Sequence, residues 1–368
     1  MGKNILITGA SGFVGRNFTK ELVKKNPDNN IYVLSRTKNS DRVIQDKIPI
    51  LDKEQILRGD FTQELNLYPE PEIIYHLGAS TDLEVSTPEE LNEMKKANIE
   101  GTKNIINFAK RCKNFQHLFW MGTFYVSGLT SEVIEEDKLP KRNSFRNYYE
   151  ETKWEAEKLV RESGLPFTIF RPSIIIGNSK TQDSQGERRM MYGYLLGIAY
   201  PLRKYFRTKG KRLFDNLDSN SPLEINLRLI GNNSTTKNFV CIDDVVECML
   251  RISQTSCEGK TYNLTNKLDI FGSNIAYAIE QALNIRGIQY VGREISNPTE
   301  TELAIMNYTK PFVPYAINSD PKGDTTNTDN AINGFYERVL MTPTLFTKML
   351  KRFVEQELVR GGKDDTKI

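Results

Sequence analysis

Residues that bind metals or form disulfides are scarce in this sequence. Its 368 residues include two histidines, His76 and His117, and four cysteines, none of them in a Cys-x-x-Cys pair. Zinc and non-haem iron sites draw several ligands from these residue types, so we expect no metal site. The cysteine spacing shows no disulfide framework of the short secreted kind, which favours reduced thiols and a cytoplasmic protein.

Long apolar runs and a strong charge of either sign are also missing. No apolar run approaches the roughly 20 residues that cross a bilayer, and no signal peptide precedes the first predicted strand, so we expect no transmembrane span. The formal net charge is +3, and it gives no reason to expect a nucleic-acid partner. The length allows one large or two moderate domains with a sizeable core.

What the sequence does have is a glycine-rich turn near its start, in residues 4–15, NILITGASGFVG. Gly9 permits a tight turn, Gly12 lets the backbone approach a pyrophosphate, and Gly15 lets the following helix pack closely. The glycine triplet alone also fits an ordinary turn. A strand before it, a helix over 16–25 and a second strand at 31–35 favour a dinucleotide site at the helix N-terminus. The other residues expected there are Ser11, Phe13 and Val14.

The end of the second strand, residues 34–36, indicates which dinucleotide binds. An NAD-preferring site carries an acidic residue there for the ribose 2′-hydroxyl, whereas this chain has Leu-Ser-Arg. Arg36 suits a 2′-phosphate, and Arg16 can join it. The alternative is that both arginines are solvated surface charges. We expect NADP(H), with NAD(H) as the less favoured cofactor.

Further cofactor contacts are expected where later strands end. Asp60 can accept a hydrogen bond from the adenine amino group, and the small residues after the strand at 73–77 can lie along the cofactor. His76, at the end of that strand, fits a packed structural histidine better than a catalyst. The remaining candidates are Phe61, Leu77, Gly78, Ala79 and Asn98.

The alternation of strand and helix patterns predicts the fold class. Six such alternations occur in the first ~177 residues, which argues for an α/β fold with a doubly wound parallel sheet. The pattern breaks after residue 178 and returns at 238–242 and 261–264. We therefore predict a cofactor domain over 1–178 plus about 238–265. A smaller α+β substrate-binding domain would comprise 179–237 plus 266–360, followed by a polar tail at 361–368.

Three residues form a candidate catalytic set. Thr123 follows the strand at 118–121, at a carboxyl end where ligands bind in such sheets. Tyr149 and Lys153 are four residues apart, so a helix places them on one face. A lysine ammonium beside a phenol lowers the tyrosine pKa and makes it a usable proton donor. Tyr200/Lys204 and Tyr205/Lys209 share the spacing, but only Tyr149 follows the Thr123 strand and begins an amphipathic helix.

At this point the chain resembles the extended short-chain dehydrogenase/reductases. The matching residues span about 3–265 in the family's order: Thr8 to Gly15, Asp60, Gly78-Ala79, Asn98 with Gly101-Thr102, Thr123, Tyr149 with Lys153, Arg171-Pro172 and the 239–245 segment. The resemblance implies a Rossmann cofactor domain and hydride transfer at nicotinamide C4. It also implies that Thr123 binds the substrate oxygen, Tyr149 exchanges the proton, and Lys153 lowers the tyrosine pKa and holds the ribose.

Two further points follow from the resemblance. The backbone from Pro172 to Ile174 would seat the nicotinamide carboxamide. Family members often carry two or three consecutive hydroxyl residues where this chain has Met121, Gly122 and Thr123. Thr123 alone is therefore left to hold the substrate oxygen.

Within the family, residues 122–128, 145–149 and 153–157 look like the fatty-acyl and carrier-thioester reductases. We therefore expect NADPH-dependent reduction of a CoA- or carrier-linked acyl thioester. The alternatives are a nucleotide-sugar epimerase or dehydratase, a hydroxysteroid-like ketone reductase, and a non-catalytic protein that senses NAD(P). A homodimer is expected only by analogy with the family.

Two later segments carry predictions of their own. Residues 188–214 contain eight basic residues and no acidic one around an apolar run. They fit either a helix with a solvated basic edge or a docking face for an anionic carrier or headgroup. Residues 312–315 and 320–330 look like a loop covering a site. A helix over 344–357 has an apolar face that favours core packing over a partner surface.

Overall fold

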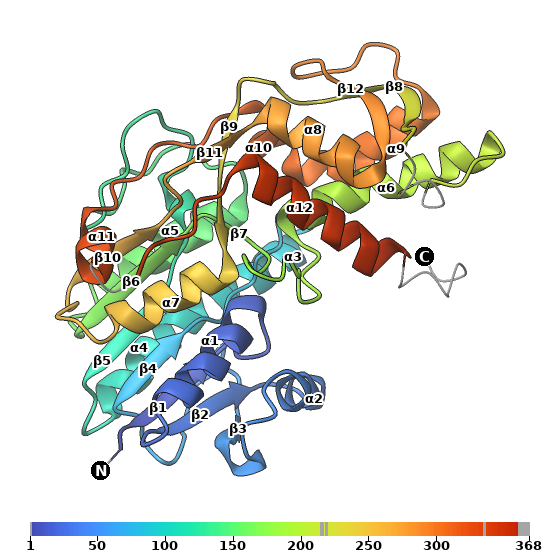
Figure 1. The fold of residues 1–368 in the computed structure, drawn as a ribbon. Coiled ribbons are helices and arrows are strands. Elements are labelled where there is room, and N and C mark those ends of the chain that lie inside the picture. The colour runs from blue at the N-terminus through green and yellow to red at the C-terminus, as the bar shows by residue number, and fades with distance from the viewer. Residues whose placement is uncertain (1, 214–216, 218–219, 334–335, 360–368) are drawn as a thin grey trace. The chain divides into compact units, whose positions relative to one another are not determined.

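The computed structural model describes residues 2–213, 217, 220–333 and 336–359, and these divide into two compact units (Figure 1). The first unit comprises Met1–Ser173, Ile242–Thr265 and Pro321–Glu337. The second comprises Ile174–Cys241, Asn266–Asp320 and Arg338–Ile368. The predicted tail at 361–368 lies outside the described residues. Among the residues described, no helix is both long and apolar enough to span a bilayer.

A seven-stranded parallel sheet forms the centre of the first unit, in the order β10-β6-β5-β4-β1-β2-β3. Most of its strands are apolar on both faces, as strands covered by helices on both sides must be. The strands are β1 (Asn4–Thr8), β2 (Asn30–Ser35), β3 (Ile56–Arg58), β4 (Ile73–His76), β5 (His117–Met121), β6 (Phe167–Pro172) and β10 (Lys260–Leu264). The predicted α/β class with a doubly wound parallel sheet is confirmed.

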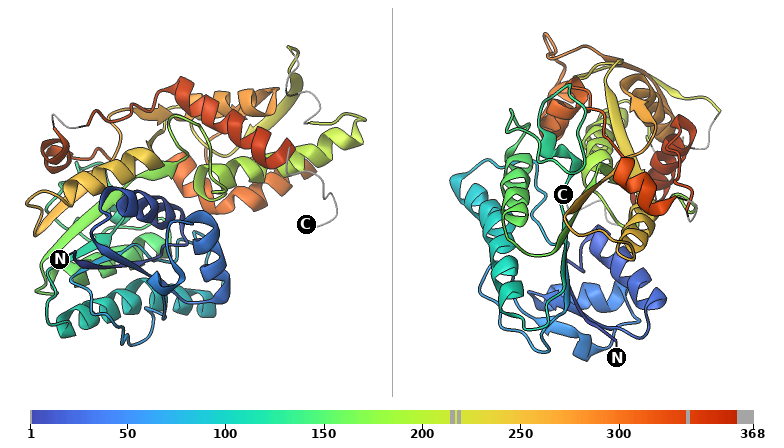
Figure 2. Two further views of the ribbon diagram at one scale, coloured as in Figure 1. Left: turned by 60° about the horizontal axis from the view of Figure 1, so that its bottom comes forward. Right: turned by 90° about the vertical axis from the view of Figure 1, so that its left-hand side faces the viewer.

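Helices cover both faces of this sheet. Helices α1 (Phe13–Lys25) and α7 (Ile242–Ile252) pack together on one face, and α4 (Gly101–Arg111) and α5 (Tyr148–Arg161) on the other (Figure 2). The remaining helical elements are α2 (Lys38–Lys47), α3 (Pro88–Lys95), α11 (Thr326–Ile332), the 3-10 turns η1 (Lys53–Gln55) and η3 (Phe124–Ser127), and the π-helix η2 (Lys96–Glu100).

The alternation of side chains along β5 divides the core into two layers. Trp120 points to the face where Ile105 of α4 and Val160 of α5 pack in one cluster. Phe119 points to the opposite face, where its ring stacks on Tyr75 with centroids 4.5 Å apart. Tyr75 in turn contacts Phe18 of α1 at 4.7 Å. One strand thus anchors helices on both sides of the sheet.

The second unit is α+β, as predicted. Strands β11 (Asp269–Phe271), β9 (Thr236–Cys241) and β7 (Ile174–Ile176) form a three-stranded sheet, and β12 (Ile285–Tyr290) pairs with β8 (Leu223–Leu229). Helix α12 packs on α8, and α6 packs on α9. The helical elements are α6 (Met190–Thr208), α8 (Gly272–Leu283), α9 (Glu300–Thr309), η5 (Lys310–Phe312), α10 (Val313–Ile317), α12 (Pro343–Phe353) and the π-helix η6 (Val354–Val359).

Residues 321–337, predicted to belong to the substrate domain, group with the first unit instead. The buried Glu136 carboxylate holds them there, because it accepts hydrogen bonds from the Thr328 hydroxyl at 2.7 Å and from the Asn327 amide. The same carboxylate accepts the Asn263 amide of β10 at 2.9 Å. This sequence-distant carboxylate therefore ties the segment to the edge strand of the main sheet.

The predicted loop over 312–315 and 320–330 is wrong in part. Residues 312–315 are helical, in η5 and α10 of the second unit, and residues 326–330 belong to α11 of the first unit, whereas 320–325 are not helical. Pro311 is the second residue of η5, and Pro314 is the second residue of α10. Proline is well tolerated at a helix start because its φ is already helical and its missing N–H has no partner to lose. Here the prolines begin helices.

Segment 188–214 is mostly helix α6, and its apolar run is not exposed. Leu195, Ile198 and Ala199 are all buried in the second unit. The exposed residues at the end of the segment are mostly basic. They are Lys204, Arg207, Lys209, Lys211 and Arg212, together with Thr208 and Gly210. The segment is therefore a core helix with a basic edge, and Phe214 lies outside the described residues. The predicted helix at 344–357 likewise turns its apolar face inward, with Phe346 against Phe239 at 4.7 Å.

A buried ion pair joins the helix α5 to the sheet. Arg171 of β6 is fully buried, and its Nε donates to Glu157 Oε2 at 2.9 Å. Its Nη atoms donate to the carbonyls of Glu135 at 3.1 Å and Lys138 at 2.8 Å. Burial alone would raise the pKa of Glu157, but the guanidinium groups of Arg171 and Arg161 outweigh burial and lower it.

Replacing Arg171 should therefore destabilise the first unit. Arg171→Leu leaves Glu157 buried with half its partners, and we expect the free energy of unfolding to fall by about 3–5 kcal/mol. Urea unfolding followed by tryptophan fluorescence measures this, because Trp120 and Trp154 both lie in this unit. The matched control is Lys158→Leu, whose exposed pair with Glu162 on the same helix has an N···O distance of 3.8 Å, and which should cost under about 1 kcal/mol.

The difference in the free energy of unfolding between wild type and Arg171→Leu should also become smaller in acid. A carboxylate whose folded pKa is lowered stabilises the fold above its unfolded pKa, and that stabilisation is lost as the pH falls through the folded pKa. Equal stability of Arg171→Leu and Lys158→Leu at neutral pH would contradict this role for the buried pair.

Candidate active site

The glycine turn after β1 lies directly against the segment after β4. Gly9 has φ +75°, and a Cβ there would stand 2.6 Å from the Gly78 nitrogen. A Cβ on Gly15 would stand 2.1 Å from the Gly9 carbonyl oxygen. Neither position can carry a side chain without moving backbone. The sequence prediction for these two glycines therefore has a direct structural reason.

The N-terminus of α1 has the chemistry of an anion site. Gly12 is its N-cap, and within the described residues no side chain caps the helix and no acidic residue occupies its first turn. The free N–H groups and the positive end of the helix dipole suit a pyrophosphate. Ser11 and Val14 are half-buried beside this turn, and Phe13 is buried. The turn therefore fits the predicted dinucleotide.

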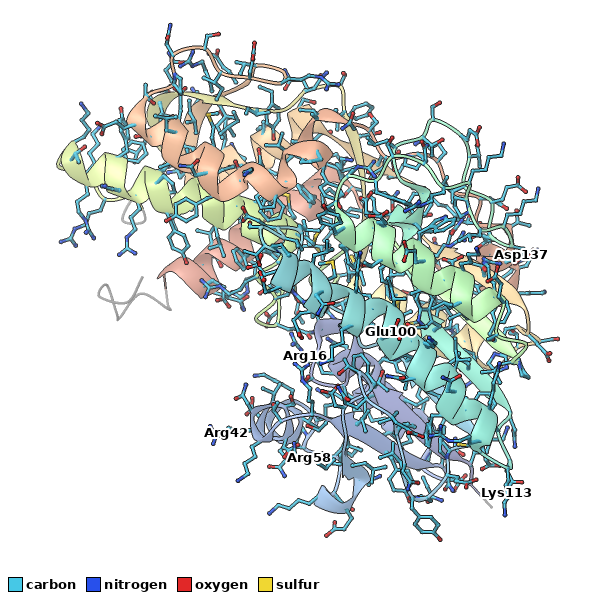
Figure 3. The ribbon with its side chains drawn as sticks, turned by 180° about the vertical axis from the view of Figure 1, so that it is seen from behind. Arg16, Arg42, Arg58, Glu100, Lys113 and Asp137 are labelled. Carbon is cyan, nitrogen blue, oxygen red and sulfur yellow. The ribbon has the colours of Figure 1, made fainter. Side chains whose placement is uncertain are left out.

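Several basic residues lie on the neighbouring elements. Arg36 is exposed directly after β2, and the Arg16 guanidinium lies 5.2 Å from the Phe13 ring centroid. Figure 3 shows Arg16, Arg42 and Arg58 in this part of the unit, on α1, α2 and β3. Arg58 forms an ion pair with Asp41 of α2.

Phe61 is positioned by packing. Its ring meets His76 edge-on with centroids 5.1 Å apart. A Cβ at Gly78 would come within 2.7 Å of this ring, and one at Gly101 within 2.6 Å. The ring therefore explains why both neighbours are glycine. Asp60, the candidate adenine contact, is half-buried, and its carboxylate accepts the Thr62 amide at 2.9 Å.

His76 is structural, as predicted. The ring is buried, and its Nδ1 lies 2.6 Å from the Thr8 hydroxyl. Burial, and next the charge of Lys153, lower the pKa of His76 to about 3, so it stays neutral. The chain after β4 runs through the half-buried Leu77 and Ala79, and the Leu77 amide donates to the Thr8 carbonyl at 3.3 Å.

Asn98 links the cofactor side of the unit to helix α5. It lies in the π-helix η2, an irregularity often found at functional sites. Its side-chain amide donates to the Ser80 carbonyl and to the Thr152 hydroxyl, both at 3.0 Å, and its oxygen accepts the Ser80 amide at 2.8 Å. Thr152 then donates to the Tyr149 carbonyl at 3.1 Å. Asn98 thus braces the first turn of α5, a role that sequence spacing did not reveal.

The predicted catalytic residues all lie in the first unit, at the carboxyl end of β5 and the start of α5. Thr123 lies two residues after the end of β5 and is buried, with its hydroxyl accepting the Tyr125 amide at 3.3 Å. Tyr149 is half-buried in the first turn of α5. Lys153, one turn later, donates from Nζ to the Met121 carbonyl at 2.6 Å. That bond brings the ammonium to the backbone two residues before Thr123.

The environment of Lys153 shifts its ionisation. Its side chain is buried, and Nζ lies 3.9 Å from the Trp120 ring centroid, within cation–π range. Burial lowers the pKa of Lys153 to about 7, although the Glu157 charge acts in the opposite direction. A lysine of this kind changes charge near neutral pH, where an exposed lysine cannot. Trp120 and Glu157 were not recognised as neighbours of Lys153 from the sequence.

Gly122 has a steric reason to lack a hydroxyl. A Cβ there would lie 2.9 Å from the Trp120 ring and 3.2 Å from the Phe170 carbonyl oxygen. The large ring of Trp120 therefore occupies the space in which a serine at 122 would stand. This accounts for the departure from the consecutive hydroxyl residues of the family.

The remaining predicted residues lie further along the chain. Pro172 ends β6, paired with Leu264 of β10, while Ile174 begins β7 in the second unit. In the described ranges, no three His, Cys, Asp or Glu side chains gather in a way that could hold a metal ion. All four cysteines are buried as free thiols.

Comparisons with known proteins identify the family of this chain. The family model described as male sterility protein, an NAD-binding family, matches residues 7–217. The aldehyde reductase lnbA of Aspergillus flavus is 28% identical over 208 residues, which is 48% of this chain and 20% of the relative. This chain thus spans about a fifth of the length of that relative.

Two solved structures share the fold over almost the whole chain. The terminal R domain of the myxalamid PKS-NRPS pathway has a TM-score of 0.72 at 22% identity, covering 97% of this chain and 91% of that one. A thiolation-reductase di-domain from an archaeal non-ribosomal peptide synthetase has a TM-score of 0.67 at 17% identity, covering 98% and 76%. Since the family model matches more than half of the residues, the chain belongs to the male sterility protein family of NAD-binding domains, within the extended short-chain dehydrogenase/reductases that its motifs resemble.

Proposed function

We propose that this protein is an NADP(H)-dependent reductase of acyl thioesters. The observation that carries the proposal is the bond from Lys153 Nζ to the Met121 carbonyl. This bond holds the Lys153 ammonium at the end of β5, close in sequence to Thr123. Lys153 itself lies on α5, the helix that also carries Tyr149. A hydroxyl, a phenol and an ammonium at one strand end suit the reduction of a carbonyl.

The residues of the first unit have separate tasks in this proposal. The bound cofactor supplies a hydride at its nicotinamide C4, and the glycine turn holds its pyrophosphate. Thr123 donates a hydrogen bond to the carbonyl oxygen as negative charge develops there. Lys153 lowers the pKa of Tyr149, which can then give its proton to that oxygen. After the acyl carbon gains the hydride, the C–S bond of the resulting adduct breaks. The adduct's hydroxyl gives up its proton and the departing thiolate takes one up, so that an aldehyde and a thiol are released.

The partner that we propose is a carrier-linked or CoA-linked acyl group. Two observations support it: the likeness to a thiolation-reductase di-domain and the exposed basic edge of α6 and the residues after it. Lys204 and Arg207 belong to that edge and offer positive charge to the phosphate of such a thiol arm. A headgroup contact is less favoured, because the apolar run of the same segment is buried and leaves nothing to insert. A homodimer in the cytoplasm remains a proposal by analogy.

The first test is thiol release from a CoA- or carrier-linked acyl thioester in the presence of NADPH. Tyr149→Phe should lower kcat by about 10²–10⁴ because it removes the proton donor, while NADPH affinity stays near the wild-type value. The matched control is Tyr148→Phe, an exposed neighbour on the same helix, which should keep wild-type activity. Turnover of a UDP- or GDP-sugar or of a ketone without thiol release would refute thioester reduction. Unchanged function in Tyr149→Phe would instead favour a cofactor-sensing protein.

The pH profile should report the ionisation of Lys153. The pKa of about 7 means that Lys153 loses its charge as the pH rises through 7. We therefore expect kcat/KM for reduction, which reflects the free enzyme, to fall above that pH. Lys153→Arg keeps its charge and should lose this alkaline decline, although its plateau will be lower. Lys158→Arg on the exposed side of α5 is the control and should keep the wild-type profile. A decline that begins only near the pKa of an ordinary lysine would contradict this assignment.

Arg36 should decide the cofactor preference. A charge-assisted bond to the 2′-phosphate is worth about 1.5–3 kcal/mol, so Arg36→Ala should reduce the NADPH-to-NADH affinity ratio by about 10- to 100-fold. Fluorescence titration of both cofactors measures the ratio. Lys47→Ala, at the far end of α2, is the control and should leave it unchanged. The same ratio in Arg36→Ala and wild type would mean that Arg36 does not bind the 2′-phosphate.

A further inference from the structure

The second unit contains a pocket of its own. Its volume is about 60 Å³, and residues of β7, α6, β9, α8, β12, η5 and α10 line it. Aromatic and sulfur-containing side chains make up most of the wall: Met190, Met191, Tyr194, Phe239, Tyr290, Phe312 and Tyr315. Such a lining is typical of sites that bind the apolar part of a ligand.

The two tyrosine hydroxyls in the wall are bonded to each other. Tyr194 and Tyr290 share a side-chain hydrogen bond, and burial raises the pKa of Tyr194 to about 12. Both phenols are therefore neutral at physiological pH. The Thr235 hydroxyl, also in the wall, lies 2.7 Å from the Asn232 carbonyl oxygen and 3.2 Å from that of Ala316. These polar groups are satisfied by the protein itself.

The pocket has one cation in its described lining, and that cation is paired. Lys237 is buried and forms an ion pair with Asp320. The Asp320 carboxylate also accepts the Asn238 amide at 2.9 Å. The Lys237 ammonium lies 5.8 Å from the Tyr315 ring centroid. An anionic ligand would have to break this pair or be desolvated without a counter-charge, and both are costly.

We propose that this pocket binds the apolar segment of the acyl group and determines which acyl chains the protein accepts. The identity of the ligand as an acyl chain rests on the proposed thioester reduction. A nucleotide sugar fits the pocket poorly, because it would bring two phosphate charges to a wall whose cation is already neutralised. The volume accommodates roughly four to six water-sized groups at 10–15 Å³ each. The pocket therefore holds a few carbons or one ring.

Phe312 sets one wall of the pocket. Its ring meets Tyr194 edge-on with centroids 5.9 Å apart. A Cβ at Gly193 would lie 3.0 Å from the Phe312 ring, so the ring packs closely on α6. Removing this ring enlarges the pocket, whereas adding a ring at Ala316, which also lines it, fills it. The two substitutions should therefore act in opposite directions.

The test is direct binding of N-acetylcysteamine thioesters from acetyl to decanoyl, measured by calorimetry on the full chain without NADPH. Wild-type affinity should rise about three- to fourfold per added methylene over the first few carbons and then level off. Phe312→Ala should extend the rise to longer chains, and Ala316→Phe should abolish it. The controls are Tyr308→Ala and Leu303→Phe, exposed positions on α9 of the same unit, which should keep the wild-type dependence.

Wild-type affinity that does not depend on acyl chain length would overturn the proposal. The proposal would also be overturned if Phe312→Ala and Ala316→Phe both kept the wild-type dependence of affinity on chain length. Thermal unfolding of each variant shows whether it is folded. If one of the two pocket variants does not fold, the other alone is enough to test the proposal. Because binding is measured without hydride transfer, the two proposals can fail separately. Chain-length dependence without thiol release would refute thioester reduction alone, and thiol release without chain-length dependence would refute the acyl pocket alone.

Discussion

The buried pair between Arg171 and Glu157 is the constraint on which the active site depends. It joins β6 to α5, and Arg171 further binds the carbonyls of Glu135 and Lys138 in the loop that precedes the helix. A guanidinium without solvent contact is tolerable only when its donors are satisfied in this way. Because α5 is fixed on the sheet by this pair, Lys153, one turn before Glu157, is held against the end of β5. The position of the ammonium thus follows from an ion pair that does not itself approach the reacting groups.

The charge on Lys153 is set by two opposing effects. Burial disfavours the ammonium, whereas the Glu157 carboxylate favours it. The resulting pKa of about 7 differs strongly from that of an exposed lysine, and such shifts are common where a group must change protonation in a reaction. The centroid of the Trp120 ring lies 3.9 Å from Lys153 Nζ, and the ring also excludes a side chain at residue 122. The same aromatic residue therefore lies against the lysine and leaves Thr123 as the hydroxyl beside it.

The sequence predicted what depends on local spacing. The glycine turn, the strand ends and the pairing of Tyr149 with Lys153 follow from short-range geometry, and the fold class follows from strand and helix alternation. Contacts between distant segments were not predictable in this way. The Asn98 bonds to Ser80 and Thr152, for example, require the folded unit to bring them together. The Glu136 contacts that hold 321–337 on the first unit span more than 120 residues of sequence. The helical start at 312–315 was not predicted, although a proline such as Pro314 is well suited to the first turn of a helix.

Helix α6 gives the second unit two chemically different ends. Its first turns line the apolar pocket through Met190, Met191 and Tyr194, while its last turn and the following residues expose basic side chains. The helix has 19 residues and is therefore about 28 Å long. The proposed substrate likewise has an apolar part and a charged part, because its acyl chain is joined through sulfur to an arm that ends in phosphate. One helix can therefore favour both halves of a carrier thioester, through apolar burial at its start and charge at its end. A nucleotide sugar, polar throughout, would gain from the second feature but not from the first.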